Sequence, residues 1–266
     1  MSVISAIIYG LIQGLTEFLP VSSSAHLALY ARLANLPKEN PLLLPVLMHV
    51  ASILALIVVY RRDLVRLFGP DRRLGIYICI ATVPALIAGA AFYQFRERAT
   101  NDVHFVCGFL IVTGLILIAG DWIARRRKQL IGEHEMSWRA ALAVGLGQAV
   151  SAALPGISRS GSTISTARAV GLTREASVRF SFLLSVPTMA AAAAYQGLKT
   201  VENARHGAAL ADLVPTLIAF VVALVSSYVA ILVLIRIVRR VGLWVFAPYC
   251  FAVGVAGFIY IQFFGR

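Results

Sequence analysis

The sequence predicts an all-α integral membrane protein made of two inverted-topology repeats, each a re-entrant helical hairpin followed by three transmembrane helices. Three observations lead to this prediction. The 266 residues are 59% hydrophobic and only 14% charged, whereas about a quarter of the residues of a soluble domain are charged. A polar motif near the start of the chain returns 135 positions later. Arginines gather in alternate loops between apolar segments, as in chains that cross a membrane repeatedly.

The repeated motif divides the chain into two related halves. Six residues recur in register: Gly10, Leu11, Gln13, Leu19, Pro20 and Ser23 correspond to Gly145, Leu146, Gln148, Leu154, Pro155 and Ser158. We therefore expect a single membrane domain over residues 1–266, with repeat one at about 1–128 and repeat two at about 136–266. The first five residues include no basic side chain, so a cleaved signal peptide is not expected.

The first element is an apolar helix over residues 2–19, which Pro20 breaks. A second short helix is predicted over 23–36, bounded by the proline-containing segment 37–41. A helix of about 14 residues rises roughly 21 Å, which is too short for a hydrocarbon core of about 30 Å. The two pieces are therefore predicted to form a re-entrant hairpin, because broken backbone at membrane depth must be buried or line a cavity.

The remaining elements follow the same pattern in both halves. A second hairpin is predicted over about 138–172, broken at Pro155 and Gly156. Six segments are long and apolar enough to cross a membrane. They cover about 42–60, 74–95, 104–124, 181–199, 211–235 and 243–263.

Loop charges predict the orientation. The arginine-rich loops are expected on the cytoplasmic side; they cover 61–73, 125–139, 174–179 and 236–240. Loops with fewer basic residues are expected outside, and these cover 96–104 and 199–210. Both termini then lie outside, and the two hairpins enter from opposite faces. The formal net charge of +12 is thereby assigned to contact with anionic membrane lipids, and no nucleic-acid partner is expected.

Gln13 and Glu17 are four residues apart, so they share one face of the first helix. An ionisable group inside an apolar segment is costly and marks a functional site by default. The Glu17 carboxylate is suited to holding a divalent cation or moving protons. The alternative is a structural carboxylate that is hydrogen-bonded to nearby hydroxyls or backbone.

Three hydroxyls and an imidazole follow the first break. Ser22, Ser23 and Ser24 stand where a serine commonly caps a helix. The same place can bind an anion, because free N–H groups and the positive end of the helix dipole meet there. His26 lies over the same turn, which makes it a candidate general acid or base, or the partner of a nucleophilic serine.

The second break carries an arginine among hydroxyls. Arg159 is placed deep in the hairpin, away from the predicted loops, so its charge needs a partner. A guanidinium suits phosphate, and the surrounding hydroxyls are good donors to phosphate oxygens. The alternative is a structural ion pair with Glu17. The flanking polar and glycine positions are Ser158, Ser160, Gly161, Ser162 and Thr163. For His49 and Asp121, near the ends of predicted spans, a structural or interfacial role fits as well as a functional one.

The motifs Gln13-x-x-x-Glu17-Phe-Leu-Pro-Val-Ser-Ser-Ser-Ala-His26 and Pro155-Gly-x-Ser-Arg-Ser-Gly-x-Thr163 resemble the two signature motifs of the undecaprenyl-diphosphate phosphatase family of bacteria, the bacitracin-resistance type. The resemblance extends over the whole chain in length, motif order and hydropathy. It implies a hydrolase that converts undecaprenyl diphosphate to undecaprenyl phosphate and phosphate, recycling the lipid carrier of cell-wall synthesis. It also implies a divalent cation, Mg²⁺ or Ca²⁺, and a multi-pass protein of the bacterial cytoplasmic (inner) membrane whose site opens to the outer side.

The resemblance assigns roles residue by residue. Glu17, with Gln13, belongs to the metal and catalytic site, and Ser23 and His26 match the nucleophile and the acid/base. Arg159 matches the diphosphate-binding residue, and further substrate-binding positions are Ser22, Ser24, Ser158, Ser160, Gly161 and Thr163. The chain departs from the commonest pattern at Gln13, where many members have glutamate, and at Ser24-Ala25, where many have Thr-Gly.

Two other functions fit the same features. Inverted repeats with broken helices at the midplane are typical of transporters, so a transporter or flippase for an anionic or polyprenyl-phosphate substrate is the main alternative. A non-catalytic lipid-binding scaffold is the second. The set of Glu17, Ser23, His26 and Arg159 is richer than binding alone requires, which favours the enzyme. The sequence leaves the oligomeric state open, a homodimer included, and leaves serine and metal-bound water as alternative nucleophiles.

Overall fold

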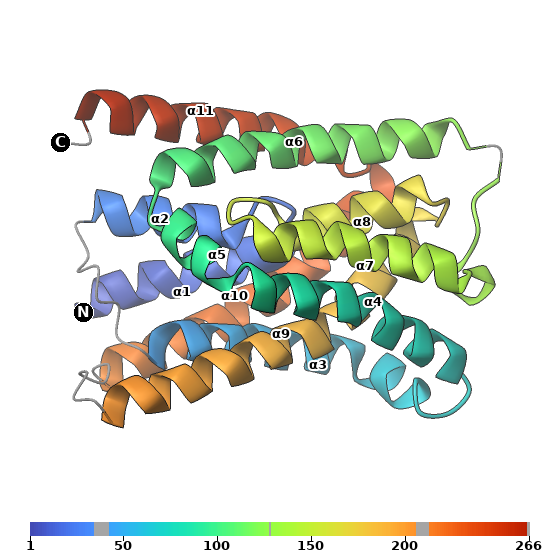
Figure 1. The fold of residues 1–266 in the computed structure, drawn as a ribbon, viewed down its shortest axis with the longest axis horizontal. Coiled ribbons are helices and arrows are strands. Elements are labelled where there is room, and N and C mark those ends of the chain that lie inside the picture. Colours follow the sequence, from blue (N-terminus) through green and yellow to red (C-terminus); the bar gives the residue numbers. More distant parts are fainter. Residues whose placement is uncertain (35–42, 128, 206–212, 265–266) are drawn as a thin grey trace.

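The computed structural model describes residues 1–34, 43–127, 129–205 and 213–264, and this part of the chain is helical without a strand (Figure 1). A single isolated bridge joins Ile131 and Leu172. The α-helices are α1 (Val3–Phe18), α2 (Ser23–Leu33), α3 (Leu43–Arg66), α4 (Arg72–Ala91), α5 (Tyr93–Thr100), α6 (Val103–Arg125), α7 (Trp138–Ala153), α8 (Arg159–Ala169), α9 (Arg174–Arg205), α10 (Leu213–Arg240) and α11 (Ala247–Phe264), with 3-10 turns η1 (Glu133–Glu135) and η2 (Trp244–Phe246).

Six of the helices in the described ranges, α3, α4, α6, α9, α10 and α11, are long and apolar enough to cross a membrane. The six predicted spans fall on these helices. Large apolar side chains such as Leu115, Val225 and Phe258 are exposed on them, as expected for helices that face lipid rather than water. These lengths and compositions point to a multi-pass membrane protein.

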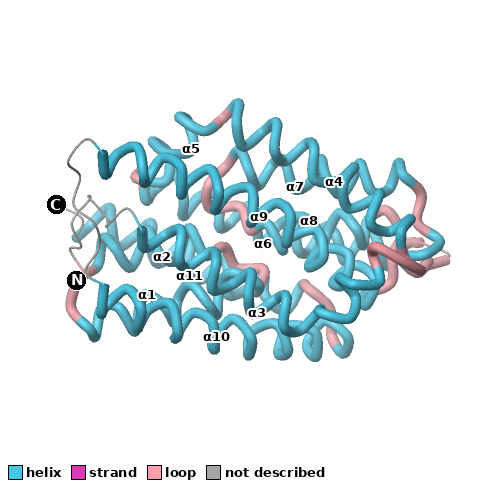
Figure 2. Tube along the Cα trace, turned by 90° about the horizontal axis from the view of Figure 1, so that it is seen from below, coloured by secondary structure: helices cyan, strands magenta, loops and turns pink. Residues whose placement is uncertain are grey.

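The two predicted breaks are confirmed as turns between helices. α1 ends at Phe18 and α2 begins at Ser23, while α7 ends at Ala153 and α8 begins at Arg159. Each pair forms a hairpin whose turn lies near the middle of the long axis (Figure 1). The free ends of α1 and α2 point toward the end that carries both chain termini, and those of α7 and α8 toward the opposite end (Figures 1 and 2).

Gly156 makes the second turn possible. Its φ is +96°, a backbone conformation that glycine adopts without steric cost. A Cβ at this position would lie 2.4 Å from the carbonyl oxygen of Val106 in α6. No other residue type therefore fits there without moving α6 away from the turn.

Glycines also bring the first helix of each hairpin close to a spanning helix. A Cβ at Gly10 would lie 2.5 Å from the carbonyl oxygen of Ala219 in α10, and a Cβ at Gly14 would lie 2.6 Å from that of Ala223. A Cβ on Gly145 of α7 would likewise lie 2.5 Å from the carbonyl of a small residue in α4. Small residues allow helices to approach in this way, and here they bring each hairpin close to a spanning helix of the other half.

The span predicted over 74–95 ends earlier than expected. α4 stops at Ala91, and residues 93–100, partly predicted as a loop, form the separate helix α5. Phe92, with φ −102° and ψ 13°, marks the break between the two helices. α5 is amphipathic and polar, with Ala99 buried against its neighbours, so it is a helix that hydropathy alone does not reveal.

The segment 174–179, predicted as a loop, is the beginning of α9. Arg179 donates to Asp63 and to Glu133, with a distance of 2.6 Å between its Nη2 and Asp63 Oδ1, and lies 3.5 Å from Asp71. These carboxylates neutralise the guanidinium, so the helix can continue through it. Helices α3 and α10 likewise extend past their predicted ends to terminal arginines. The predicted boundary at 37–41 lies outside the described residues.

Candidate active site

The two hairpin turns meet in the middle of the molecule. The backbone N–H of Gly156 donates to Ser24 Oγ at 3.2 Å, and Ser160 Oγ donates to the carbonyl of Leu19 at 3.2 Å. Both hydrogen bonds join residues more than 130 positions apart in the sequence. The two polar clusters predicted separately therefore form one site.

Glu17, on the last turn of α1, is the centre of this site. Its side chain is 8% exposed. One carboxylate oxygen, Oε2, accepts from Ser23 Oγ at 2.6 Å and from Gln13 Nε2 at 3.1 Å. The other, Oε1, accepts from Arg159 Nη2 at 3.1 Å. The predicted pairing of Gln13 with Glu17 on one helix face is thus present.

Arg159 is the first residue of α8, directly after the capping residue Ser158. Besides Glu17, its guanidinium donates to Ser185 Oγ and lies 3.3 Å from Met189 Sδ, both on α9. It also lies 6.0 Å from the centre of the Phe18 ring. The ion pair considered as an alternative is therefore formed, and the Arg159 side chain is 17% exposed.

The three serines of the first turn have different positions. Ser22 caps α2, accepting from Ala25 N at 3.4 Å, and it alone among the described non-glycine residues has a positive φ, 64°. Ser23 bonds Glu17, and Ser24 bonds both Ser22 and the second hairpin. Backbone strain at a single residue often accompanies a functional constraint, and here it turns the chain so that adjacent hydroxyls point to different partners.

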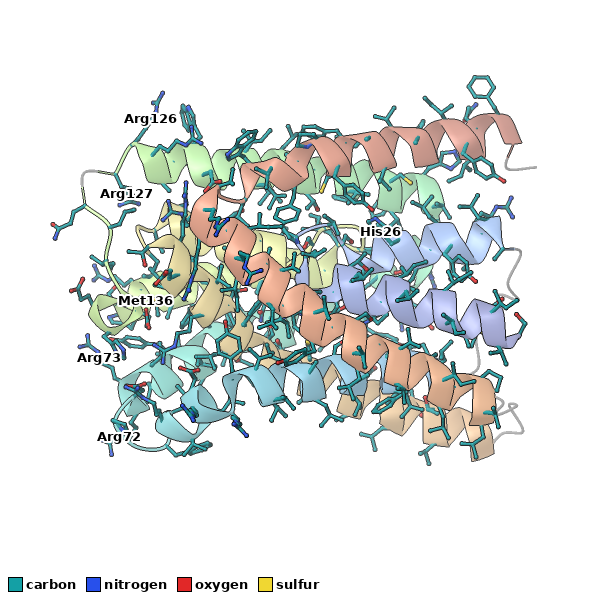
Figure 3. All side chains as sticks on the ribbon, turned by 180° about the vertical axis from the view of Figure 1, so that it is seen from behind. His26, Arg72, Arg73, Arg126, Arg127 and Met136 are labelled. Carbon is teal, nitrogen blue, oxygen red and sulfur yellow. The ribbon has the colours of Figure 1, made fainter. Side chains whose placement is uncertain are left out.

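His26 is fixed at both ring nitrogens. Nδ1 lies 2.9 Å from the carbonyl oxygen of Ser22, and Nε2 lies 2.8 Å from the hydroxyl of Tyr249 on α11. In the neutral ring the nitrogen that faces a carbonyl must donate, so Nε2 accepts from Tyr249. The predicted partner of a nucleophilic serine is thus held in place by a tyrosine (Figure 3 labels His26 in the middle of the long axis).

The hydroxyls of the second motif mainly brace the turn. Ser158 Oγ caps α8 by accepting from Gly161 N at 3.1 Å, and lies 3.2 Å from Ser160 Oγ. Thr163 Oγ1 lies 2.5 Å from Ser181 Oγ on α9. A Cβ on Gly161 would meet Ser158 at 3.1 Å. In this structure Gly161 therefore serves close packing inside the protein.

Three residues that the sequence analysis did not place in the site lie in or around it. Ser185 and Tyr249 contact Arg159 and His26 as described. Arg96, on α5, donates to the carbonyl of Ala152 at 3.0 Å, close to the second turn. His49, left undecided by the sequence, has its Nδ1 2.8 Å from the carbonyl oxygen of Pro45, one turn earlier in α3. The serines 177, 181 and 185, spaced by four in an apolar helix, are the one local signal that could have found part of this set.

Asp121, left undecided by the sequence, belongs to the structural framework. Its Oδ2 accepts from the backbone N–H groups of Leu243 and Trp244 at 2.7 and 3.1 Å. Its Oδ1 lies 3.8 Å from Arg168 Nε. The carboxylate therefore ties α6 and α8 to the start of η2, away from Glu17.

Comparison with known proteins decides the family. A family model described as bacitracin resistance protein BacA matches residues 6–256. The chain belongs to the BacA family. The match includes both hairpins and every candidate site residue from Gln13 to Tyr249, so the resemblance carried by the two motifs is confirmed.

BacA relatives of similar length cover nearly the whole chain. A Geobacter sulfurreducens protein named undecaprenyl-diphosphatase is 38% identical, over 98% of this chain and 99% of its own. Proteins of the same name from Carboxydothermus hydrogenoformans and Alcanivorax borkumensis are 39% and 35% identical, over 96% and 94% of this chain and 96% of each relative.

Proposed function

We propose that this chain hydrolyses undecaprenyl diphosphate to undecaprenyl phosphate and phosphate, which returns the lipid carrier to peptidoglycan synthesis and underlies bacitracin resistance. Membership of the BacA family and the shared name of its relatives support this function. The observation that carries it is the joining of Glu17, Ser23 and Arg159 across the two hairpins. A carboxylate, a hydroxyl and a guanidinium in contact match what phosphoryl transfer needs, which is mainly positioning and electrostatic stabilisation.

Arg159 is the group suited to bind the diphosphate. Its planar guanidinium can donate two parallel hydrogen bonds to phosphate oxygens. A bound substrate would compete with Glu17 Oε1 for this guanidinium, because both are anions. The Ser185 contact holds the guanidinium while that exchange occurs. Substrate binding would therefore release one oxygen of Glu17 at the moment when a base is needed.

Glu17 is the group suited to take a proton. Its 2.6 Å hydrogen bond from Ser23 is the geometry expected of a nucleophile beside its base. In one form of the mechanism Ser23 Oγ attacks the terminal phosphorus, its proton passes to Glu17, and the bond to the bridging oxygen breaks, so that the phosphoryl group stays on Ser23. Glu17 passes its proton to the departing oxygen and then takes one from a water, which attacks the phosphoserine. The bond from phosphorus to Ser23 Oγ breaks, Oγ regains the proton, and phosphate leaves. In the other, Ser23 and Glu17 orient and deprotonate an attacking water. In the neutral ring His26 Nε2 accepts from Tyr249, so the imidazole can take up a proton at Nε2 and could give one to a departing oxygen only once it has been protonated there.

A divalent cation, Mg²⁺ or Ca²⁺, is part of the proposal. Within the described ranges no group of three or more His, Cys, Asp or Glu side chains could hold a metal. The donors at the site are oxygens of Glu17, Gln13 and Ser23, which suits hard cations that bind through one or two carboxylates together with substrate phosphate. Gln13 donates through Nε2, so Oε1 would be its ligand atom. When bound, the cation would neutralise phosphate charge.

The finer architecture is also proposed: two inverted repeats with re-entrant hairpins, in the bacterial cytoplasmic membrane, with the site open to the outer side. The packing of α1 on α10 and of α7 on α4 supports it, because equivalent glycines make both contacts. The gathering of Arg72, Arg73, Arg126 and Arg127 at the end opposite the termini supports the orientation (Figure 3).

Single cysteines test the orientation. In a variant with the three native cysteines replaced, Asn101→Cys should react with an impermeant reagent added outside cells, and Arg72→Cys should not. Both positions are exposed, so accessibility does not bias the comparison. Labelling of Arg72→Cys from outside would reverse the proposed topology.

Phosphate release from undecaprenyl diphosphate by the purified protein in detergent tests the reaction. We expect release that EDTA removes and that added Mg²⁺ or Ca²⁺ restores, and its near loss in Glu17→Gln. The transporter alternative is tested in proteoliposomes, where it requires movement of a polyprenyl phosphate without phosphate release. Absence of hydrolysis in a folded, cation-supplied protein would overturn the proposal.

A further inference from the structure

A second basic site lies at the arginine-rich end, away from Glu17. It is a surface cavity of about 570 Å³ between the ends of α6, α8, α9 and α10. Five arginines line it: Arg125, Arg127, Arg168, Arg174 and Arg239. Figure 3 shows Arg126 and Arg127 at this end, while His26 lies at the middle of the molecule. The cavity is thus separate from the candidate active site.

The positive charge of this arginine pocket is only partly compensated. Glu175 lines the cavity and pairs with Arg239 at 3.0 Å, both side chains being more than half exposed. Asp121 stands behind Arg168 at 3.8 Å. Arg127 and Arg174 donate to backbone carbonyls, which fixes their side chains but does not neutralise their charge. Five guanidinium groups therefore face two carboxylates.

Arg168 differs from the exposed arginines of the loops because its side chain is buried. It is only 4% exposed, although it lines the cavity. Its Nη1 donates to the carbonyl of Leu172 at 2.6 Å, but its Nε is buried without a hydrogen-bond partner. This Nε faces Asp121 Oδ1 at 3.8 Å, so the guanidinium is held from behind while the side chain lines the cavity.

The surroundings place the pocket at the depth of lipid headgroups. The three tryptophans of the chain, Trp122, Trp138 and Trp244, begin or end helices at this same end and are 53, 52 and 42% exposed. Tryptophan collects at the membrane–water interface. Arg126 lies 3.7 Å over the Trp122 ring, as a cation at that interface would. Leu130 gives the cavity an apolar wall.

We propose that the arginine pocket binds the phosphate headgroup of an anionic phospholipid in the adjoining leaflet, with Arg125, Arg127 and Arg168 as its main donors. Basic pockets between transmembrane helices are suited to such headgroups. A free phosphate ion would use the same donors but would gain nothing from the apolar wall or from the interfacial depth. The site is independent of the proposed hydrolysis.

The test compares two double variants with equal loss of charge. Arg125→Gln with Arg127→Gln alters the pocket, and Arg61→Gln with Arg72→Gln removes two exposed arginines at the same end that do not line it. Binding of phosphatidylglycerol and of phosphatidylcholine to the purified full chain is measured by native mass spectrometry over a lipid titration. Arg125→Glu, a single exposed change, is a second pocket variant in case the double one unfolds.

We expect the wild type to retain phosphatidylglycerol selectively, and the pocket variants to bind it at least about tenfold more weakly, since each charge-assisted hydrogen bond is worth that much. The Arg61 and Arg72 control should change by less than about twofold, and phosphatase turnover should be unchanged in both double variants. Equal weakening in both would mean diffuse attraction and overturn the site. Displacement of the lipid by an equal concentration of inorganic phosphate would overturn the lipid assignment.

Discussion

Replacing Arg159 by lysine separates charge from geometry at the centre of the site. The guanidinium donates to Glu17 at 3.1 Å through Nη2 and to Ser185 through Nη1. A lysine keeps the charge but has no planar pair of donors, so one of the two contacts is lost. A hydrogen bond to a charged group is worth roughly 1.5–3 kcal/mol. At about 1.4 kcal/mol per factor of ten, kcat/KM should fall roughly 10- to 100-fold.

The assay is phosphate release from undecaprenyl diphosphate at saturating cation. The matched control is Arg168→Lys, the same change on the same helix, at a buried arginine that bonds Leu172 rather than Glu17. Thermal unfolding of both variants in detergent shows whether either has lost its fold. We expect the control to retain turnover within about threefold, because its guanidinium makes no contact with the Glu17 cluster.

Wild-type kcat/KM in a stably folded Arg159→Lys variant would refute the reasoning. The guanidinium would then be only a counter-charge for Glu17, and the ion pair would be structural. An equal fall in the Arg168 control would also refute it, since the loss would then come from arginine replacement in α8 in general.

Four other substitutions test the parts of the site separately. Glu17→Gln should nearly abolish hydrolysis, whereas Gln13→Ala should leave a weakened enzyme that needs more cation; equally inactive variants would remove the ranking of the two residues. Tyr249→Phe frees His26 Nε2 from a 2.8 Å hydrogen bond and should lower kcat by about 2- to 12-fold, and an unchanged kcat would show that the tyrosine does not position the imidazole. Ser24→Ala removes the acceptor of the Gly156 N–H, which joins the two turns. This should lower the Tm by about 2–4 °C per kcal/mol of stability lost. An unchanged Tm would show that this hydrogen bond does not stabilise the contact between the turns.

The breaks and the residues at them could be predicted because their signals are local. Pro20 lacks the N–H that would continue a helix and is followed, after Val21, by three serines, and Gly156 follows a proline in the second copy of the motif. Glu17 is conspicuous because it is the single carboxylate in an apolar helix. Arg159 needs a partner because a charge must be compensated at membrane depth; the sequence favoured phosphate and left an ion pair with Glu17 as the alternative, and the structure forms that ion pair.

The features that the sequence did not predict depend on contacts between distant segments. Tyr249 reaches His26 from 223 positions away, and nothing in its local sequence distinguishes it from other interfacial tyrosines. Arg179 looked like a loop residue because its compensating carboxylates, Asp63 and Glu133, come from other parts of the chain. Hydropathy marks the first charge as the end of a span, whereas a paired arginine can continue a helix.

The repeat explains why neither hairpin is a site by itself. The position equivalent to Glu17 in the second half is Ala152, and the position equivalent to Arg159 in the first half is Ser24. At these two pairs of equivalent positions, each hairpin thus has one charged residue and one neutral residue. An isolated charge at this depth would be expensive, and it becomes tolerable only when the opposite one is in contact. Under the proposed function, the ion pair of Glu17 and Arg159 would compensate both charges when no substrate is bound, and an anionic phosphate entering between them would separate the two groups and leave both free to act on it.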